Sequence, residues 1–334
     1  MPNKKGTCYQ CTPERLAAYA AAVEDLGYDG AACKLGVSRE TVRRRMRDFK
    51  STTAQDGNRP AGVDEKSLRQ IADRYTPAEL RAIALGGGSL NTPGKGKPKY
   101  SFNGDTVRIG LLTDTHLGST YTTPEKLYSA FEVFAEKSVD FIAHCGDVFE
   151  GLSSRAGHVY ECTHIGYNAQ LDHGREVFAQ WTDTDIFMID GNHDRWFTKA
   201  VGAHIVSELC DGQENLVFLG HDEGDIELAG TPATIRLWHG EDAGSYALSY
   251  RIQKIVESFT GGEKPHVLFA GHTHKATYVF DRHIHCVSAG SIQSQSKWMR
   301  GKRIAAHTGF WVVEIVVDKN GVVSFAPTWY PFYD

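Results

Sequence analysis

The chain has 334 residues, about twice a typical domain length, so we expect at least two folded units. Its hydrophobic content of 41% and charged content of 23% fit a globular protein. No apolar run approaches the roughly 18 residues of a membrane span, and the N-terminus lacks the apolar stretch of a signal peptide. Seven scattered cysteines do not resemble a disulfide framework, so we expect a cytoplasmic protein without a membrane partner.

The net charge of -5 is unevenly distributed along the chain. Residues 1–50 contain 10 Lys and Arg against 6 Asp and Glu, which gives +4. The remainder holds 26 basic and 35 acidic residues, which gives -9. Any nucleic-acid affinity that arises from bulk charge is therefore expected in the N-terminal unit.

The first 50 residues predict helices separated by glycine turns. From Thr12 onward, apolar residues recur at helical spacing, as expected of an amphipathic helix. After a turn at residues 27–30, a short helix reaches Gly36, and Ser38 can cap a further helix that carries Val42 and Met46. This order is typical of a helix-turn-helix domain, which we assign to residues 1–50.

The predicted recognition helix and its flanks are basic, with seven Lys and Arg and two Asp and Glu in residues 34–50. Exposed arginines on such a helix can contact DNA phosphates or base edges. The alternative is a solvated basic face on a small protein-interaction bundle. We predict DNA contact through Arg39, Arg43, Arg44, Arg45 and Arg47. Cys8 and Cys11 have CxxC spacing but no nearby partner pair, so their role stays open.

Residues 51–106 are predicted to be a linker that contains one helical segment at 64–85. From residue 107 to 334, short apolar runs alternate with helical patterns, which predicts an α/β fold. Polar residues able to bind metals follow the ends of several of these runs. In α/β folds, side chains at the carboxyl ends of strands converge on one crevice, so a site is expected there.

Five short motifs occur in order, each after a predicted strand. They are D-x-H at residues 114–116, GD-x-x-E at 146–150, GNHD at 191–194, WHG around His239 and GHTH at 271–274. Each motif alone is weak, because turn-rich sequences and single histidines are common. Five of them in this order are very unlikely by chance.

With these motifs, residues 107–334 resemble the calcineurin-like metallophosphoesterase superfamily, which includes SbcD-type nucleases, cyclic-nucleotide phosphodiesterases and protein phosphatases. Residues 249–259 and 296–303 resemble segments of phage and prokaryotic phosphoesterases. The resemblance implies an α/β fold in which a two-sheet sandwich is flanked by helices. It is specific for fold and metal site, but not for substrate.

The resemblance also implies a centre with two divalent metal ions. Manganese is expected, with Fe, Zn, Ni or Co as alternatives, since mixed imidazole and carboxylate ligands suit such ions. The pair would lower the pKa of a shared water, and the hydroxide would attack phosphorus. One metal would be held by Asp114, His116 and His274, and the other by Asn192, His239 and His272, with Asp147 bridging both.

The residues that follow Asn192 are catalytic candidates in the same resemblance. His193 is expected to face the leaving group as general acid or transition-state stabiliser. Asp194 either orients His193 or only shapes the loop, and Arg195 either meets the substrate phosphate or forms a loop salt bridge. The basic segment downstream of GHTH supplies further candidate substrate-binding residues, namely Lys297, Trp298 and Arg300, unless it is an ordinary surface loop.

Three functions remain open from the sequence. We expect a DNA-directed phosphodiesterase, in which residues 1–50 hold DNA and the C-terminal domain hydrolyses a phosphodiester. The alternative is a small-molecule phosphoesterase that acts on nucleotides or cyclic nucleotides and uses its N-terminal module for regulation. A non-catalytic DNA-binding protein is disfavoured, because a degenerate relative would lose metal ligands first and none is missing.

Overall fold

The computed structural model describes residues 13–37, 39, 41–43, 45–46, 97–241, 247–260 and 262–333. The chain divides into two compact units, Met1–Leu90 and Asn91–Asp334. The predicted helical segment at 64–85 and the pair Cys8 and Cys11 lie outside the described residues. In the described part, no helix combines the length and apolarity needed to cross a membrane.

The N-terminal unit is built from helices around a small apolar core. Helix α1 (Pro13–Leu35) bends at Gly27, whose backbone is left-handed (φ 67°), so the expected turn is reduced to a kink. After Gly36, residues 39, 41–43 and 45–46 are again helical. The side chains of Tyr19, Ala31 and Val42 are buried together with Ala22 and close this core.

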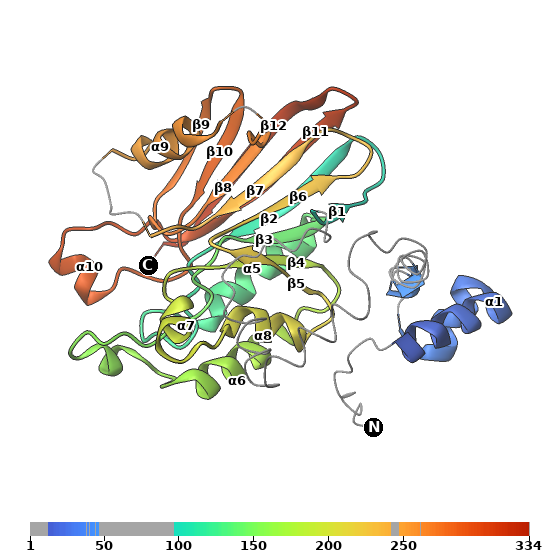
Figure 1. The fold of residues 1–334 in the computed structure, drawn as a ribbon, viewed down its shortest axis with the longest axis horizontal. Helices are drawn as coiled ribbons and strands as arrows, with labels where there is room; N and C mark the ends of the chain where they lie inside the picture. The colour runs from blue at the N-terminus through green and yellow to red at the C-terminus, as the bar shows by residue number, and fades with distance from the viewer. Residues whose placement is uncertain are drawn as a thin grey trace, which may run out of the picture. The chain divides into compact units, whose positions relative to one another are not determined.

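The C-terminal unit contains two six-stranded mixed sheets (Figure 1). The first has the order β1 (Lys99–Tyr100), β6 (Glu223–Leu228), β7 (Thr234–Trp238), β8 (Val267–Ala270), β10 (Ile284–Ala289) and β9 (Ala276–Asp281). The second has the order β12 (Gly321–Pro331), β11 (Gly309–Asp318), β2 (Thr106–Leu112), β3 (Phe141–His144), β4 (Ile186–Asp190) and β5 (Leu216–His221).

Helices cover the outer faces of both sheets, as Figure 1 shows. The second sheet packs against α5 (Pro124–Glu136), α6 (Tyr167–Phe178), α7 (Arg195–Val201) and α8 (Ile205–Asp211). The first sheet packs against α9 (Tyr250–Ser258). A short α10 (Lys297–Gly301) and a 3-10 turn at His158–Glu161 lie in the connections. The described unit is therefore the two-sheet α/β sandwich flanked by helices that the sequence predicted.

Alternation along the strands explains this layering. In β4, Phe187 and Ile189 point into the core between the sheets, whereas Ile186 and Met188 point toward the helices. Successive side chains of a strand face opposite sides, so a strand that is buried on both faces reads as a continuous apolar run. Such runs end at the same edge of the two sheets, and the polar residues that follow them are brought together there.

Candidate metal centre and active site

The seven predicted metal ligands converge at the carboxyl ends of five strands. Two sheets contribute, because β2, β3 and β4 belong to one sheet and β7 and β8 to the other. All but Asn192 and His272 are at least nine-tenths buried. Asp114 and His116 follow β2, Asp147 follows β3, Asn192 follows β4, His239 follows β7, and His272 and His274 follow β8.

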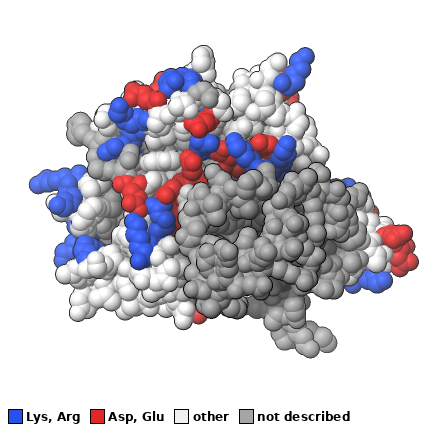
Figure 2. Space-filling view, viewed as in Figure 1, with Lys and Arg blue, Asp and Glu red and all other residues white. Residues whose placement is uncertain are grey.

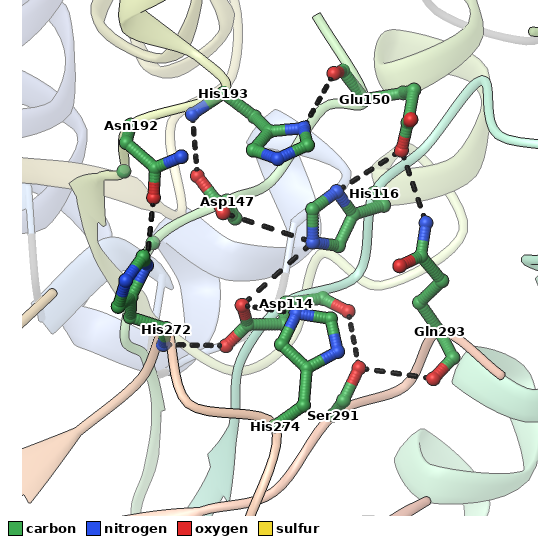
Figure 3. A network of polar contacts seen from close by, with 12 residues as sticks. Asp114, His116, Asp147, Glu150, Asn192, His193, His272, His274, Ser291 and Gln293 are labelled. Atoms are coloured by element: carbon green, nitrogen blue, oxygen red, sulfur yellow. Dashed lines mark hydrogen bonds and ion pairs between the residues drawn. The ribbon is translucent and has the colours of Figure 1, made fainter. Parts of the chain in front are cut away.

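One group of ligand atoms surrounds Asp114 (Figure 3). Its Oδ1 lies 3.0 Å from Nε2 of His274 and 3.7 Å from Nε2 of His116. The second group lies on the other side of Asp147, whose Oδ2 is 3.1 Å from Nε2 of His239 and 3.7 Å from Nε2 of His116. Asp147 therefore stands between the two groups, in the place of a bridging carboxylate.

The amide of Asn192 joins the second group. Its Oδ1 lies 2.8 Å from Nδ1 of His272 and 3.3 Å from Nε2 of His239. The two groups coincide with the two ligand sets that the sequence resemblance implies, although their binding of metal stays a prediction.

The backbone at the site is strained. Asp114, His116, Asp147, His272 and His274 all have positive φ angles, between 45° and 70°. Residues other than glycine rarely adopt this left-handed region, and such strain persists where the surrounding structure enforces it, most often at functional sites. Five of the seven predicted ligands therefore hold conformations that the fold imposes on them.

Glycines next to the ligands allow the loops to approach one another. A Cβ atom on Gly191 would lie 2.2 Å from Oδ1 of Asp147 and 2.4 Å from its backbone nitrogen. A Cβ atom on Gly146 would lie 2.7 Å from Nδ1 of His239, and the φ angle of Gly146 is 87°. Only glycine fits these two positions without displacing a predicted ligand.

Hydrogen bonds behind the ligands orient the imidazoles. Nδ1 of His239 donates to the carbonyl oxygen of Cys145 at 2.6 Å, which leaves Nε2 facing Asp147. Nδ1 of His116 lies 3.1 Å from the carboxylate of Glu150, which leaves its Nε2 facing both aspartates. Such partners fix the tautomer of a histidine ligand and raise its basicity.

The two aspartates among the predicted ligands, Asp114 and Asp147, remain ionised although they are buried. Burial opposes ionisation of Asp147, but the charge and hydrogen bond of His239 hold its pKa well below the usual range. Burial likewise disfavours a charge on His239, whereas the Asp147 carboxylate raises the pKa of that imidazole to about 9. The pocket floor thus attracts positive charge strongly.

The donor atoms fit divalent cations. Nε2 of His116 is buried and makes no hydrogen bond, and the carboxylate oxygens that it faces, Oδ1 of Asp114 and Oδ2 of Asp147, each lie 3.7 Å away. Buried polar atoms without partners are costly, and a cation between such atoms would satisfy them. Carboxylate, imidazole and amide donors also match the ligands that Mn, Fe, Co, Ni and Zn accept.

His193 lies beside the predicted ligands and lines the pocket, but its ring belongs to neither of the two groups that surround Asp147. Its backbone N–H donates to Oδ1 of Asp147 at 2.8 Å, and its Nδ1 donates to the carbonyl oxygen of Glu150 at 2.8 Å. The ring packs between His116 and Trp196, with centroid distances of 4.5 and 3.9 Å. Burial lowers the pKa of His193 to about 4.

Asp194 shapes the loop and does not orient His193. Its two carboxylate oxygens accept hydrogen bonds from the backbone N–H groups of Val148, Phe149 and Gly191, at 2.8 to 3.1 Å. The side chain is 1% exposed. Of the two alternatives for Asp194, these contacts favour loop-shaping, because the carboxylate holds the 191–194 loop against the segment that follows β3.

Arg195 forms salt bridges, which is the second of the two alternatives that the sequence left open for this residue. Its guanidinium pairs with Asp222 and with Glu241, the latter at 2.7 Å. Arg195 does not line the pocket over the candidate metal centre, whereas Glu241 does. Both acidic partners lie far along the chain and are invisible in the local sequence, and the structure favours the salt-bridge alternative, while a catalytic role for Arg195 stays a prediction.

A pocket of about 600 Å³ opens above the predicted ligands. The ligands His116, Asp147, Asn192, His272 and His274 line it together with His193. Of the predicted substrate-binding residues, Trp298 lines this pocket and is 47% exposed, whereas Lys297 and Arg300 are exposed on α10 outside the lining.

The predicted DNA-binding arginines are only partly described. Arg39 is exposed and pairs with Asp29 at 3.2 Å, and Arg43 is exposed near the ring of Tyr28. Arg45 is only 6% exposed, which leaves little of its side chain accessible to a phosphate. Arg44 and Arg47 lie outside the described residues.

Glu150 and Gln293 were not assigned roles from the sequence, yet they form the wall behind His116 (Figure 3). Glu150 lies 2.8 Å from Nε2 of His158 and accepts a hydrogen bond from Nε2 of Gln293 at 3.0 Å. Glu150 was visible as the last residue of the GD-x-x-E motif. Gln293 carries no motif, and only the fold brings it to Glu150, 143 positions away.

Residues 107–308 match the calcineurin-like phosphoesterase superfamily domain, so the chain belongs to this superfamily and is a metal-dependent phosphoesterase. No curated protein matches the chain.

Several solved structures are similar to parts of the chain. An archaeal phosphodiesterase is 16% identical, with a TM-score of 0.39, over 67% of this chain and all of the other. The phosphoesterase YfcE from E. coli is 14% identical, with a TM-score of 0.39, over 66% and 98%. The nuclease MPE from Pseudomonas putida is 15% identical, with a TM-score of 0.34, over 61% and 84%.

Proposed function

We propose that the protein is a dinuclear-metal phosphodiesterase that acts on DNA. The observation that carries the proposal is the position of Asp147 between two groups of imidazoles, at the floor of a pocket that Trp298 also lines. Two bound divalent cations would activate a water molecule and neutralise charge on the phosphate oxygens. The side chains of the pocket would bind the substrate and transfer protons.

The residues position the substrate and handle protons. Asp114 and Asp147 keep their carboxylates ionised, and the backbone of His193 holds one oxygen of Asp147 in place. With Nδ1 of His193 fixed on the Glu150 carbonyl oxygen, Nε2 is the ring nitrogen left to meet the leaving oxygen. A fixed orientation of this kind allows proton transfer without reorganisation.

The charges around the pocket favour a diester over a monoester. Arg155 is the one Lys or Arg among the described residues that line it, and both of its terminal nitrogens bond the carboxylate of Glu161, at 2.7 and 3.3 Å. A phosphomonoester carries about one more negative charge than a diester near neutral pH. A site with one neutralised arginine therefore suits the less charged ester.

The surface beside the pocket suits a nucleic-acid strand. Lys297, Arg300, Lys302 and Arg303 are exposed around Trp298. Figure 2 shows basic side chains at the edge of the molecule where Figure 1 places α10. A positively charged surface with an exposed aromatic ring can follow a phosphate backbone while the ring stacks on a base. The basic residues of segment 1–50 would add contacts to duplex DNA.

A nucleotide or cyclic nucleotide is the second candidate substrate. The pocket volume of about 600 Å³ is in the range of sites for single small molecules. A nucleotide would be hydrolysed at the same metal centre as DNA, but it would not extend along the surface around Trp298.

The test is a comparison of substrates with the Mn-loaded protein. Single-stranded DNA, duplex DNA, cyclic nucleotides and a chromogenic phosphodiester are incubated with wild type, Trp298→Ala and Asp147→Asn. We expect hydrolysis of DNA and of the chromogenic ester, and a loss of both in Asp147→Asn by at least about 10²-fold. Trp298→Ala should raise KM for single-stranded DNA by roughly 5- to 150-fold, the equivalent of about 1–3 kcal/mol per stacked base.

Tyr333→Ala removes an exposed aromatic ring that does not line the pocket and serves as the matched control. Turnover of cyclic nucleotides without turnover of DNA would replace the DNA proposal by the second candidate. Near-normal turnover by Asp147→Asn under saturating Mn would refute the dinuclear centre.

A further inference from the structure

A second cluster of metal-binding side chains lies outside the pocket. Asp190 ends β4, His221 ends β5, and His204 precedes the first residue of α8. Each offers one ligand atom, and these atoms lie within 4.8 Å of one another. None of the three lines the pocket over the candidate active site.

The sheet itself places two of these residues side by side. Asp190 and His221 are paired in the register of β4 and β5. Oδ2 of Asp190 lies 2.5 Å from Nδ1 of His221, while Oδ1 accepts a hydrogen bond from the backbone N–H of Asp222 at 3.0 Å. Because Asp190 is 3% exposed, its carboxylate direction is fixed by this packing.

His204 completes the cluster from the helix side. Its ring centroid lies 4.7 Å from that of His221, with an angle of 42° between the planes. Oγ1 of Thr198 lies 3.4 Å from Nδ1 of His204. The imidazole of His221 is partly open to solvent, with 40% of its side chain exposed, so an ion can enter from that side.

The basic side chains near the cluster are paired with acidic ones. The charge of Arg195 lowers the pKa of His221 and so disfavours positive charge there, but this charge is itself balanced. The guanidinium is paired with both Asp222 and Glu241, and Glu241 also pairs with Lys199 at 2.7 Å. The carboxylate of Asp190 therefore adds to acidic groups that already balance the local basic side chains.

We infer that Asp190, His204 and His221 form a third metal site, which takes a borderline divalent ion such as Zn²⁺. Two imidazole nitrogens and one carboxylate oxygen form a three-ligand set that zinc accepts, with water in the fourth position. The ion would join the ends of β4 and β5 to the start of α8. Asp190 directly precedes the 191–194 loop, so the ion would anchor the base of the loop that carries Asn192 and His193.

The test counts metal ions in the full chain. Wild type and the double variant His204→Ala, His221→Ala are titrated with Zn²⁺ by calorimetry, and bound metal is measured after desalting. We expect the double variant to bind one ion fewer per chain and to keep Mn-dependent hydrolysis of the chromogenic ester. In wild type, Co²⁺ should give a visible absorption band of a four-coordinate site that the double variant lacks.

His164→Ala, His173→Ala is the matched control, because those two rings stack at a centroid distance of 4.0 Å and belong to none of the described metal-competent groups. Equal metal counts and equal titrations for wild type and the His204, His221 variant would overturn the inference. If circular dichroism shows that this variant is unfolded, His221→Gln replaces it. A drop in Zn²⁺ affinity of at least about tenfold is then expected, and an unchanged affinity refutes the site.

The inference stands apart from the proposed function. Loss of the third ion with both active-site ions retained supports it whatever the substrate is. Loss of hydrolysis in Asp147→Asn with the third ion retained tests the active centre alone.

Discussion

The imidazole of His193 is oriented by a main-chain oxygen and by two neighbouring rings. Glu150 supplies the oxygen, and His116 and Trp196 supply the rings. The pKa of His193 is lowered to about 4 by burial, so the ring is mostly neutral at pH 7. With its proton on Nδ1, neutral His193 accepts a hydrogen bond at Nε2, and only the protonated ring can donate one there.

This protonation state gives a prediction for His193→Ala. For a diester with a poor leaving group, the variant should be about 10²- to 10⁴-fold slower at the optimum while it keeps both active-site metals. The protonated fraction of His193 falls as pH rises above about 4. The ratio of wild-type to variant rate should therefore decrease between pH 5 and pH 8, because an acid is lost on deprotonation.

The measurement is the ratio of kcat/KM for the two proteins across pH, with the metal content checked at each point. Because the nucleophile and the metals titrate equally in both proteins, their effects cancel in the ratio. A ratio that is constant, or that rises with pH, would rule out proton donation by His193.

At the scale of single residues, the sequence located the candidate ligands that belong to local motifs. The metal-ligand candidates follow strand ends, and the structure brings all seven together. The sequence could not show that Arg195 is paired and that Arg45 is buried, because exposure and partners depend on distant residues. The carboxylate of Glu241, for example, lies 46 positions beyond Arg195.

Strand ends are the elements that make this site. The parallel pairs β2 with β3 and β3 with β4 deliver Asp114, Asp147 and Asn192 from adjacent positions of one sheet. The connecting loops must then pass within van der Waals distance of one another. Gly191 is the closest of these approaches, since its missing side chain leaves space for Asp147.

We therefore expect Gly191→Ala to act through Asp147. The added methyl would meet Oδ1 of Asp147 at 2.2 Å, so the loop or the carboxylate must move. Overpacking of this kind costs about 1–3 kcal/mol of folding free energy, and displaced ligands lower metal affinity by about 10- to 100-fold. Urea denaturation and Mn titration measure the two effects.

Gly301→Ala is the control, because a Cβ atom there meets nothing within 4 Å. It should leave both quantities at wild-type values. Wild-type metal affinity in Gly191→Ala would show that the loop relaxes freely, and would contradict a rigid approach at this position.

The elements that carry motifs were the ones the sequence located. Strands β3, β4 and β8 are buried runs that end in polar motifs, and β2 is fully buried from Ile109 onward. Strand β7 alternates buried and half-buried residues but also ends in a motif, and helices α5 and α6 show clear amphipathic patterns. Strands β5 and β6 have mixed burial and no motif, so their pairing depends on tertiary contacts. Local periodicity does not encode such contacts.

On the scale of the whole molecule, charge and chemistry are segregated. Residues 1–50 carry +4 and the remainder carries -9. The two compact units divide after Leu90, and every predicted metal ligand lies in the second. The N-terminal unit has its own apolar core around Val42. Binding of duplex DNA and hydrolysis of a phosphodiester should therefore be separable functions.

Deletion of residues 1–90 tests this division of labour. If the N-terminal unit makes most phosphate contacts, the truncated protein should bind duplex DNA more weakly and with a flatter salt dependence. Each lost contact reduces the slope of log K against log salt concentration by about 0.9. Hydrolysis of the chromogenic diester should survive, because the catalytic unit keeps its sheets, its core and its ligands.

A substitution in the full chain separates loss of charge from loss of the unit. Arg43→Ala combined with Arg44→Ala and Arg47→Ala should reproduce the binding defect, while Lys319→Ala, an exposed lysine in the catalytic unit, should not. Filter binding at several salt concentrations gives the slope for each protein. An unchanged slope in the truncated protein would mean that the N-terminal helices are not the DNA anchor. The exposed cations around Trp298 would then have to supply the phosphate contacts, and Arg300→Ala should flatten the slope in their place.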